Sequence, residues 1–272
     1  MGSRSRLAGL IAAAIAATAL FAPVAQAGTP APGYSQFSGC PDKVEYPNGL
    51  DCIRTVIEGG YFQMGSKNVP IENPITLSGG FDPETGVLKA SPKGGLAPVK
   101  EKVPGGVVGL TGLSWLVEFL GSEALTLYAV TELAGQPIVS LSGQVTLPIK
   151  VHLINDVLGS KCYVGSAAEP IVLHLSTGTT SPPPPNKSIT GKEPEFSFTE
   201  SPEIFFFKDG AFVDNSFAAP GASGCTLTLL GVLPVGINGL VNSQSGLPSP
   251  AGTNATEQKF NMELANQGLV YP

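Results

Sequence analysis

Two histidines, His152 and His174, are all that the chain offers for general acid–base chemistry or for imidazole ligation of zinc. A serine-type triad needs a histidine as its base, and zinc sites usually bring histidines together in a short motif. The sequence contains no HExxH motif and no GxSxG nucleophile turn, since Gly112–Leu116 fails the second pattern at its last position. Both histidines occupy polar positions of alternating stretches, where an exposed side chain is the simpler interpretation. We therefore predict neither a catalytic residue nor a metal site.

Acidic residues could supply the carboxylate pair of a glycoside hydrolase, which must lie about 5–10 Å apart. Five glutamates are candidates by their neighbours or their density: Glu118, Glu123, Glu132, Glu193 and Glu195. Asp82 and Glu84 lie in a glycine-ended turn that lacks the alternating acids and closing glutamate of a calcium loop. None of these residues is distinguished from an ordinary surface acid, and we expect no cofactor.

Four cysteines indicate disulfides if the chain is exported. Cys40, Cys52, Cys162 and Cys225 allow three connectivities. We favour Cys40–Cys52 and Cys162–Cys225, because the first two cysteines are close in sequence and the last two enclose one block of the sequence. A thiolate metal site is the alternative, but the sequence contains no CxxC spacing.

The first 27 residues have the pattern of a signal peptide. Arg4 and Arg6 precede the apolar stretch Leu7–Phe21, and Ala25–Ala27 offers a small-x-small cleavage site. A retained membrane anchor is the alternative, although the apolar stretch is short for a bilayer span. Cleavage near Ala27 would leave 13 basic and 21 acidic residues, which disfavours binding to nucleic acid. We predict a secreted or cell-wall-associated chain without a transmembrane segment after cleavage.

Composition favours many short strands joined by turns, because only 13% of residues are charged while 34 are glycine and 25 are proline. Gln144–Leu153 has the clearest strand pattern, with apolar and polar residues alternating along it. Pro148 within it predicts an edge strand or a bulge. About ten such stretches predict a single antiparallel β-sandwich or barrel-like domain with long Gly/Pro-rich loops.

The remaining segments refine this organisation. Leu110–Gly121 is the one stretch with helical spacing, so at most one short helix is expected. Ile204–Phe207 is apolar throughout and predicts a strand that is covered on both faces. Residues 28–39 predict a flexible N-terminal segment, and residues 40–272 a single β-rich domain. The proline run Pro182–Pro185 is short for a spacer and would lie inside a loop closed by Cys162–Cys225.

Several motifs resemble a group of uncharacterised secreted proteins of actinobacteria. The similarity lies in LGSKCYVGS, TGTTSPPPPNK and DNSFAAPGASGC, and it extends over most of the chain after residue 27. The resemblance implies that the segments on both sides of the proline run belong together, and it fits the Cys162–Cys225 pairing. It implies no activity and no catalytic residues.

The sequence thus favours a non-catalytic extracellular or cell-envelope-associated protein with a structural or binding role. A carrier of an apolar ligand or lipid within a β-barrel is a second hypothesis, motivated by the high apolar share, and an unrecognised secreted hydrolase is a third. A cell-envelope component and an apolar small molecule are accordingly the candidate partners. An enclosed cavity above roughly 300 Å³ would support the carrier hypothesis.

Overall fold

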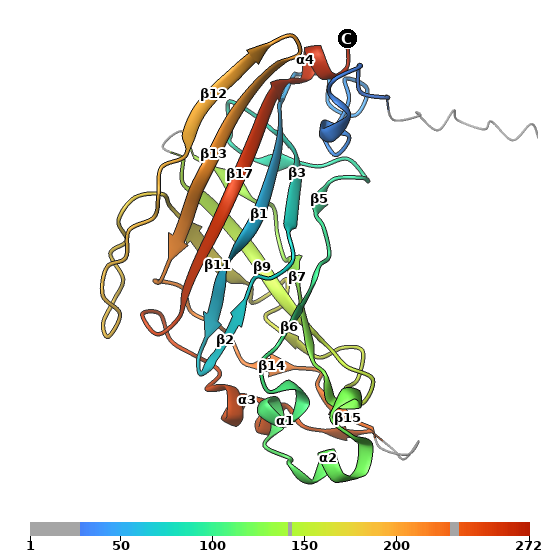
Figure 1. Cartoon of the computed structure of the whole chain (residues 1–272), viewed down its shortest axis with the longest axis vertical. Helices are drawn as coiled ribbons and strands as arrows, with labels where there is room; N and C mark the ends of the chain where they lie inside the picture. Colours follow the sequence, from blue (N-terminus) through green and yellow to red (C-terminus); the bar gives the residue numbers. More distant parts are fainter. Residues whose placement is uncertain (1–27, 141–142, 229–233) are drawn as a thin grey trace, which may run out of the picture.

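The structure, a computed structural model, describes residues 28–140, 143–228 and 234–272. Two antiparallel sheets pack against one apolar core, and short helices gather at one end (Figure 1). This arrangement confirms the prediction of an all-β, sandwich-like fold. Among the described residues, no helix is long and apolar enough to cross a membrane.

The first sheet joins strands from both ends of the described chain. Its order is β12 (Glu195–Glu200), β13 (Glu203–Asp214), β17 (Ala255–Asn266), β1 (Asp51–Met64), β3 (Ile75–Phe81) and β4 (Leu88–Lys89). Two short strands extend it, because β2 (Lys67–Pro70) pairs with β1 and β5 (Gly95–Leu96) pairs with β3. The central pairing of β1 with β17 is antiparallel over nearly the whole length of both strands.

The second sheet is organised around β9 (Val145–Ile154), the strand with the clearest alternation in the sequence. Leu147, Ile149, Val151 and Leu153 of β9 are buried, so the alternation predicts the core face correctly. The order is β14 (Ala222–Ser223), β10 (Tyr163–Val164), β9, β7 (Tyr128–Leu133) and β6 (Lys100–Lys102), with β8 (Ile138–Val139) and β11 (Ile171–Leu175) also paired to β9.

Pro148 lies inside this central strand, and the prediction of an edge or a bulge there is wrong. On one side β9 pairs with β11 without a break. On the other side the β7 ladder ends at the Leu133–Ile149 pair, and β8 begins at Thr146. The proline therefore falls where the ladder is interrupted, so its missing N–H disrupts no pairing. Its carbonyl still accepts a hydrogen bond from the Ala134 N–H at 2.9 Å.

The described residues contain four short α-helices, more than the single helix expected. α1 (Gly106–Thr111) and α2 (Trp115–Leu120) replace the helix expected over Leu110–Gly121. Gly112 between them has a φ of 73°, the left-handed conformation that commonly ends a helix. The 3-10 turn η2 (Glu123–Leu125), α3 (Asn238–Ser245) and the paired strands β15 (Thr226–Leu227) and β16 (Val235–Gly236) complete this end of the molecule, and α4 (Gln267–Val270) lies at the other (Figure 1).

The proline run is a loop that is held at several points. A disulfide joins Cys162 and Cys225, so Pro182–Pro185 lies inside a covalently closed segment, as predicted. Asn186, the next residue, donates its N–H to the Gly252 carbonyl at 3.0 Å. Its side-chain amide donates to the Asn215 and Asn254 carbonyls at 2.9 and 2.8 Å. These bonds attach the loop to the chain leading into β17.

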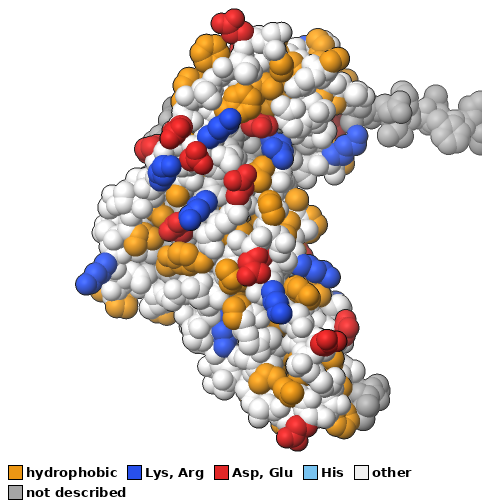
Figure 2. Space-filling view, viewed as in Figure 1, with side chains coloured by type: hydrophobic (Ala, Val, Ile, Leu, Met, Phe, Trp, Pro, Cys, Tyr) orange, Lys and Arg blue, Asp and Glu red, His pale blue; other side chains and the backbone are white. Residues whose placement is uncertain are grey.

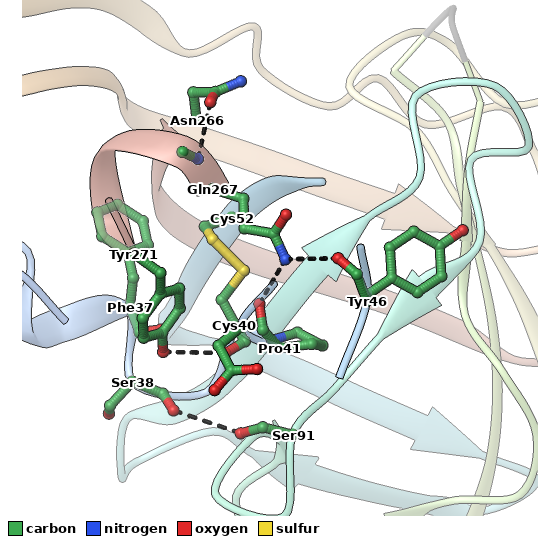
Figure 3. Close-up of a disulfide and its surroundings, with 12 residues drawn as sticks. Phe37, Ser38, Cys40, Pro41, Tyr46, Cys52, Ser91, Asn266, Gln267 and Tyr271 are labelled. Atoms are coloured by element: carbon green, nitrogen blue, oxygen red, sulfur yellow. Dashed lines mark hydrogen bonds between the residues drawn. A yellow bond between two sulfur atoms is a disulfide. The ribbon is translucent and has the colours of Figure 1, made fainter. Parts of the chain in front are cut away.

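The N-terminal segment packs against the end of the first sheet, contrary to the flexible segment expected for residues 28–39. Phe37, in the 3-10 turn η1 (Ser35–Phe37), is 1% exposed. The predicted Cys40–Cys52 disulfide links this segment to β1 (Figure 3). Tyr271 donates its hydroxyl to the Cys40 carbonyl at 3.0 Å, and Gln267 donates its side-chain amide to the Pro41 carbonyl at 2.8 Å (Figure 3). Burial of Phe37 and a hydrogen bond from the Ala31 N–H to the Val270 carbonyl at 2.8 Å therefore anchor a segment whose composition resembles a flexible one.

Candidate functional site

The inner face of the first sheet forms the candidate site. Directly opposed residues of antiparallel strands project from the same face, so the register identifies the members of this face. On β1 and β17, three opposed pairs point inward: Ile53–Leu264, Thr55–Met262 and Ile57–Phe260. The intervening Arg54 and Glu263 point outward and form an ion pair at 3.7 Å. The sheet thus has a polar outer face and a largely apolar inner face.

Two adjoining apolar cavities lie between the sheets, with volumes of about 100 Å³ and about 70 Å³. The larger is lined by strands of both sheets, including Met262 of β17 and Val145 of β9. Ile57, Leu147 and Gln258 line both cavities, so the two spaces meet at these side chains. The space between the sheets is therefore neither filled nor a single enclosed chamber of 300 Å³.

A surface cleft of about 410 Å³ opens at the helical end of the molecule. Pro70 lines both this cleft and the smaller cavity. Apolar side chains from the β6–α1 connection, the helices and η2 contribute to the cleft, including Val103, Val108, Val117 and Leu125. This volume falls within the usual range for ligand clefts. The surface cleft near α2 and the smaller cavity between the sheets are therefore neighbours that share the Pro70 side chain.

At the other end, the inner face continues onto four phenylalanines that the second sheet does not cover. Phe196 and Phe198 of β12 lie opposite Phe207 and Phe205 of β13. Phe196, Phe198 and Phe205 are 59%, 57% and 37% exposed, and the ring centroids lie 5.4–6.5 Å apart. We call these four residues the phenylalanine face. The prediction that Ile204–Phe207 is covered on both faces is therefore wrong.

The register links the phenylalanine face to the inner cavity. Phe207 lies opposite Met262 of β17, and Met262 lines the larger cavity. The other face of the hairpin is covered, because Ile204 is buried and Phe206 packs with it against the N-terminal segment. Because only one face is covered, Phe196, Phe198 and Phe205 lie exposed side by side on the other face.

Gln258 is the main polar group between the two inner cavities. Its side chain is buried, and its Nε2 lies 3.5 Å from the Thr256 hydroxyl. Its Oε1 accepts no hydrogen bond from any described residue. Glu101, at the edge of the smaller cavity, is by contrast fully engaged, since its carboxylate accepts the N–H groups of Glu72 and Asn73 at 3.0 Å. Glu101 therefore holds the β2–β3 turn.

His152 lies on the outer face of the second sheet and lines none of these cavities. Its ring stacks on Tyr163 with centroids 4.2 Å apart, and Nε2 lies 3.1 Å from the Ser160 carbonyl. Its Nδ1 lies 3.5 Å from Glu132, which also forms an ion pair with Lys150 at 3.0 Å. Both ring nitrogens thus face protein oxygens in a solvated surface cluster. The alternation along β7 and β9 predicts that Glu132, Lys150 and His152 share this face, but no sequence pattern indicates that Tyr163 joins them.

His174 is exposed on β11 and does not approach His152. The register aligns His174 with Thr146 and Tyr163 with His152, both along β9. Six residues along a strand span about 20 Å, so the two imidazoles are too far apart to ligate one metal ion. Although β9 and β11 are neighbours, a shared zinc site is therefore excluded.

The candidate carboxylates lie on separate elements. Glu118, Glu123 and Glu132 belong to α2, η2 and β7, while Glu195 begins β12 opposite Lys208. Glu193 accepts a hydrogen bond from the Thr177 hydroxyl at 2.6 Å. None of the five lines an inner cavity or the cleft at the helical end.

Asp82 forms the ordinary turn that the sequence favoured. Its Oδ1 accepts the Glu84 N–H at 2.9 Å, and its Oδ2 accepts the Tyr46 hydroxyl at 2.6 Å. The hydrogen bond from Tyr46 lowers the pKa of Asp82, and the same bond raises the pKa of Tyr46. The carboxylate thereby secures a loop.

A polar cleft of about 630 Å³ lies over β13 and β17. Its charged lining residues have both signs and are mostly exposed: Glu58, Lys192, Asp209, Glu257 and Lys259. Lysines and acids are interspersed over the upper and middle parts of the face visible in Figure 2. This mixture produces no strong field of one sign and marks the cleft as a solvated groove.

Comparisons with protein-family models, with curated proteins and with solved structures yielded no match.

Proposed function

We propose that the protein is a secreted, non-catalytic binding protein that takes up an elongated apolar ligand along the inner face of its first sheet. The observation that carries the proposal is a succession of neighbouring apolar sites, which we call the apolar route: the cleft at the helical end, the two inner cavities and the phenylalanine face, each linked to the next by an apolar residue. Pro70 lines both the cleft and the smaller cavity, and Ile57 and Leu147 line both inner cavities. Met262 lines the larger cavity and lies opposite Phe207 of the phenylalanine face. A ligand here would lie along an open sheet, and not inside the closed barrel of the original carrier hypothesis.

Secretion is part of this proposal. Two disulfides and the lack of a membrane-spanning helix among the described residues are compatible with it. The signal-peptide pattern of residues 1–27 and the resemblance to secreted actinobacterial proteins point the same way. A cell-envelope lipid is a natural ligand for an exported protein of this kind. The hydrolase hypothesis has less support, because His152 and the candidate carboxylates lie away from the apolar route.

Titration with fluorescent fatty acids of increasing chain length tests the proposal. Affinity should rise with length, by up to about 0.8 kcal/mol for each CH₂ group that becomes buried. Native mass spectrometry of the secreted protein should in addition detect a retained lipid. If no chain length binds and no lipid is retained, the proposal is wrong.

A matched pair of variants locates the site. Thr131 lines the smaller inner cavity, whereas Thr146 lies on the outer face of β9 beside the polar residues that alternate with its core positions. Thr131→Phe should fill the cavity and weaken binding by about tenfold or more, equivalent to about 1.4 kcal/mol. Thr146→Phe should leave binding unchanged. Equal effects of the two substitutions would place the ligand elsewhere.

A further inference from the structure

β12 is an exposed edge strand whose charged residues, Glu195 and Glu200, lie only at its two ends. It ends the first sheet, and among the described strands only β13 pairs with it (Figure 1). All six of its residues, Glu195–Glu200, are exposed. Edge strands are normally protected by charged side chains along their length, especially lysine, by proline or by a bulge, because their free N–H and C=O groups can pair with another chain. The register of β12 with β13 is regular over all six residues, and none of the six is lysine or proline.

The side chains of β12 define which partner strand fits. Phe196 and Phe198 project from one face of the strand, with Ser197 and Thr199 on the other. A partner strand that continues the phenylalanine face must place apolar residues two positions apart opposite this pair. A second copy of β12, running antiparallel, supplies that spacing in one register.

In that register, Ser197 lies opposite Ser197 of the second copy. Phe196 then lies opposite Phe198 of the second copy, and the reverse pair follows by symmetry. Glu195 lies opposite Thr199 of the second copy and Glu200 opposite its Pro194, so no acid faces an acid directly. Aromatic pairs placed directly opposite each other stabilise antiparallel strands, whereas like charges in that position destabilise them.

The neighbouring symmetric registers fit less well. If the two strands pair with Phe198 opposite Phe198 of the second copy, Phe196 lies opposite Glu200 of the second copy. If they pair with Phe196 opposite Phe196 of the second copy, Phe198 lies opposite Pro194 of the second copy. Both shifts keep the phenylalanines on one face, but they replace the two reciprocal Phe196–Phe198 pairs with mismatched ones. The register centred on Ser197 is the one in which all four β12 phenylalanines of the two copies pair with one another.

We propose that two copies of the chain associate through their β12 strands, antiparallel, with the twofold axis passing between the two Ser197 residues. The first sheets of the two copies become one continuous sheet, and their phenylalanine faces become one aromatic surface. The interface is isologous, as closed dimers require. This inference goes beyond the proposed ligand and does not depend on it, because it rests on the register and the exposed edge.

Cysteine cross-linking tests the register directly. The four native cysteines are all paired in disulfides, so a new cysteine is the single free thiol. Directly opposed residues of antiparallel strands have Cα atoms about 4.5–5.5 Å apart, within the range of a disulfide. Ser197→Cys should therefore form a covalent dimer under mild oxidation. Thr199→Cys should not, because the two Thr199 residues lie four positions apart along the strand, about 13 Å.

A mixture of two variants adds a stricter criterion. Glu195→Cys and Thr199→Cys should each remain uncross-linked alone but should cross-link when mixed, because residue 195 faces residue 199 of the other copy. Equal cross-linking of Ser197→Cys and Thr199→Cys would indicate random collision and overturn the proposal.

Sedimentation equilibrium of the full chain provides the second test. The wild type should show a concentration-dependent dimer, and Phe196→Ser/Phe198→Ser should raise the dimer dissociation constant at least tenfold. Both residues are exposed, so the fold should survive, and an unchanged circular dichroism spectrum would verify this. A strictly monomeric wild type contradicts the proposal, whether it stays free in solution or binds lipid vesicles through the phenylalanine face.

Discussion

Gly210 lies directly against the ring of Phe260. A Cβ atom added at Gly210 would approach the Phe260 Cζ atom to 2.4 Å, closer than any ordinary contact. Phe260 is 2% exposed and stacks on Phe212 with ring centroids 4.0 Å apart, so the ring cannot move away freely. The contact occurs where the register of β13 against β17 shifts, between Phe207 and Gly210.

Gly210→Ala should therefore destabilise the fold by about 1–3 kcal/mol, the usual cost of overpacking a core. Thermal and urea denaturation measure the change in the free energy of unfolding. Gly239→Ala is the matched control, because Gly239 lies in α3 and an added Cβ meets nothing within 4 Å. There alanine should be neutral or stabilising by up to about 1 kcal/mol. Equal effects of both substitutions would contradict the ring contact as the cause.

The Cys162–Cys225 disulfide should contribute more to stability than the Cys40–Cys52 disulfide. The first spans 63 residues of sequence and the second 12. Removing a native disulfide costs about 2–5 kcal/mol, and in the chain-entropy account the longer loop adds roughly 1.5 kcal/mol to that cost. Urea unfolding of Cys162→Ala/Cys225→Ala and of Cys40→Ala/Cys52→Ala compares them. A larger loss from the shorter loop would show that native contacts around Cys40 outweigh the entropy term.

Much of the sandwich follows from local patterns. The alternation along β9 predicts its buried face, and the cysteine spacing favours the pairing that the structure contains. The predictions fail where contacts between segments distant in sequence determine the local structure. Pro148 occupies the middle of a sheet because two partner strands leave a gap beside it. Phe37 is buried because Tyr271, close to the end of the chain, lies next to it, 234 residues away in sequence.

The candidate site was harder to foresee, because it depends on how far one sheet extends beyond the other. The apolar run Ile204–Phe207 predicts burial on both faces, and the sequence carries no signal that the second sheet ends before reaching it. Similarly, Pro70, Met262 and Gln258 come from distant segments and meet only through the packing of the two sheets. A single sequence contains no spacing that would connect them.

Asn254, which begins an Asn-x-Thr sequence, is a buried junction between distant segments. Its side chain is fully buried. Its Oδ1 accepts the Gly65 N–H at 2.9 Å and the Ser249 hydroxyl at 2.6 Å, and its Nδ2 donates to the Phe217 carbonyl at 2.9 Å. These bonds join the turn after β1 to the segment between β13 and β14 and to the segment after α3.

Asn254→Asp should be strongly destabilising, by about 3–5 kcal/mol, because it places an uncompensated charge in a buried site and removes the amide donor. Thermal denaturation at pH 7 measures the loss. Asn68→Asp is the control, because Asn68 is an exposed residue of β2. It should cost less than about 0.5 kcal/mol. If Asn254→Asp lowers the free energy of unfolding no more than Asn68→Asp does, the Asn254 side chain is solvated in solution and the buried junction is contradicted.

Asp42 anchors the start of the described chain. Its Oδ2 accepts a hydrogen bond from the Gly28 backbone N–H, and its Oδ1 accepts the N–H groups of Glu45 and Val44 at 2.8 and 2.9 Å. The hydrogen bond from Gly28 is the largest of the causes that lower the pKa of Asp42. If the signal peptide is removed after Ala27, the Gly28 nitrogen becomes an ammonium group, and the attraction to the Asp42 carboxylate increases.

Because the pKa of Asp42 is lowered on folding, its contribution to stability is present above the unfolded-state pKa, about 3.9, and is lost as the pH falls through the lower folded-state value. Asp42→Asn should therefore lower the melting temperature at pH 7, and its difference from the wild type should shrink as the pH falls below about 4. The loss at pH 7 should be larger in a chain that begins at Gly28 than in the full-length chain. The exposed Asp156→Asn variant is the control. A difference between wild type and Asp42→Asn that stays constant from pH 7 to strong acid would show that Asp42 acts through its shape and not through its charge.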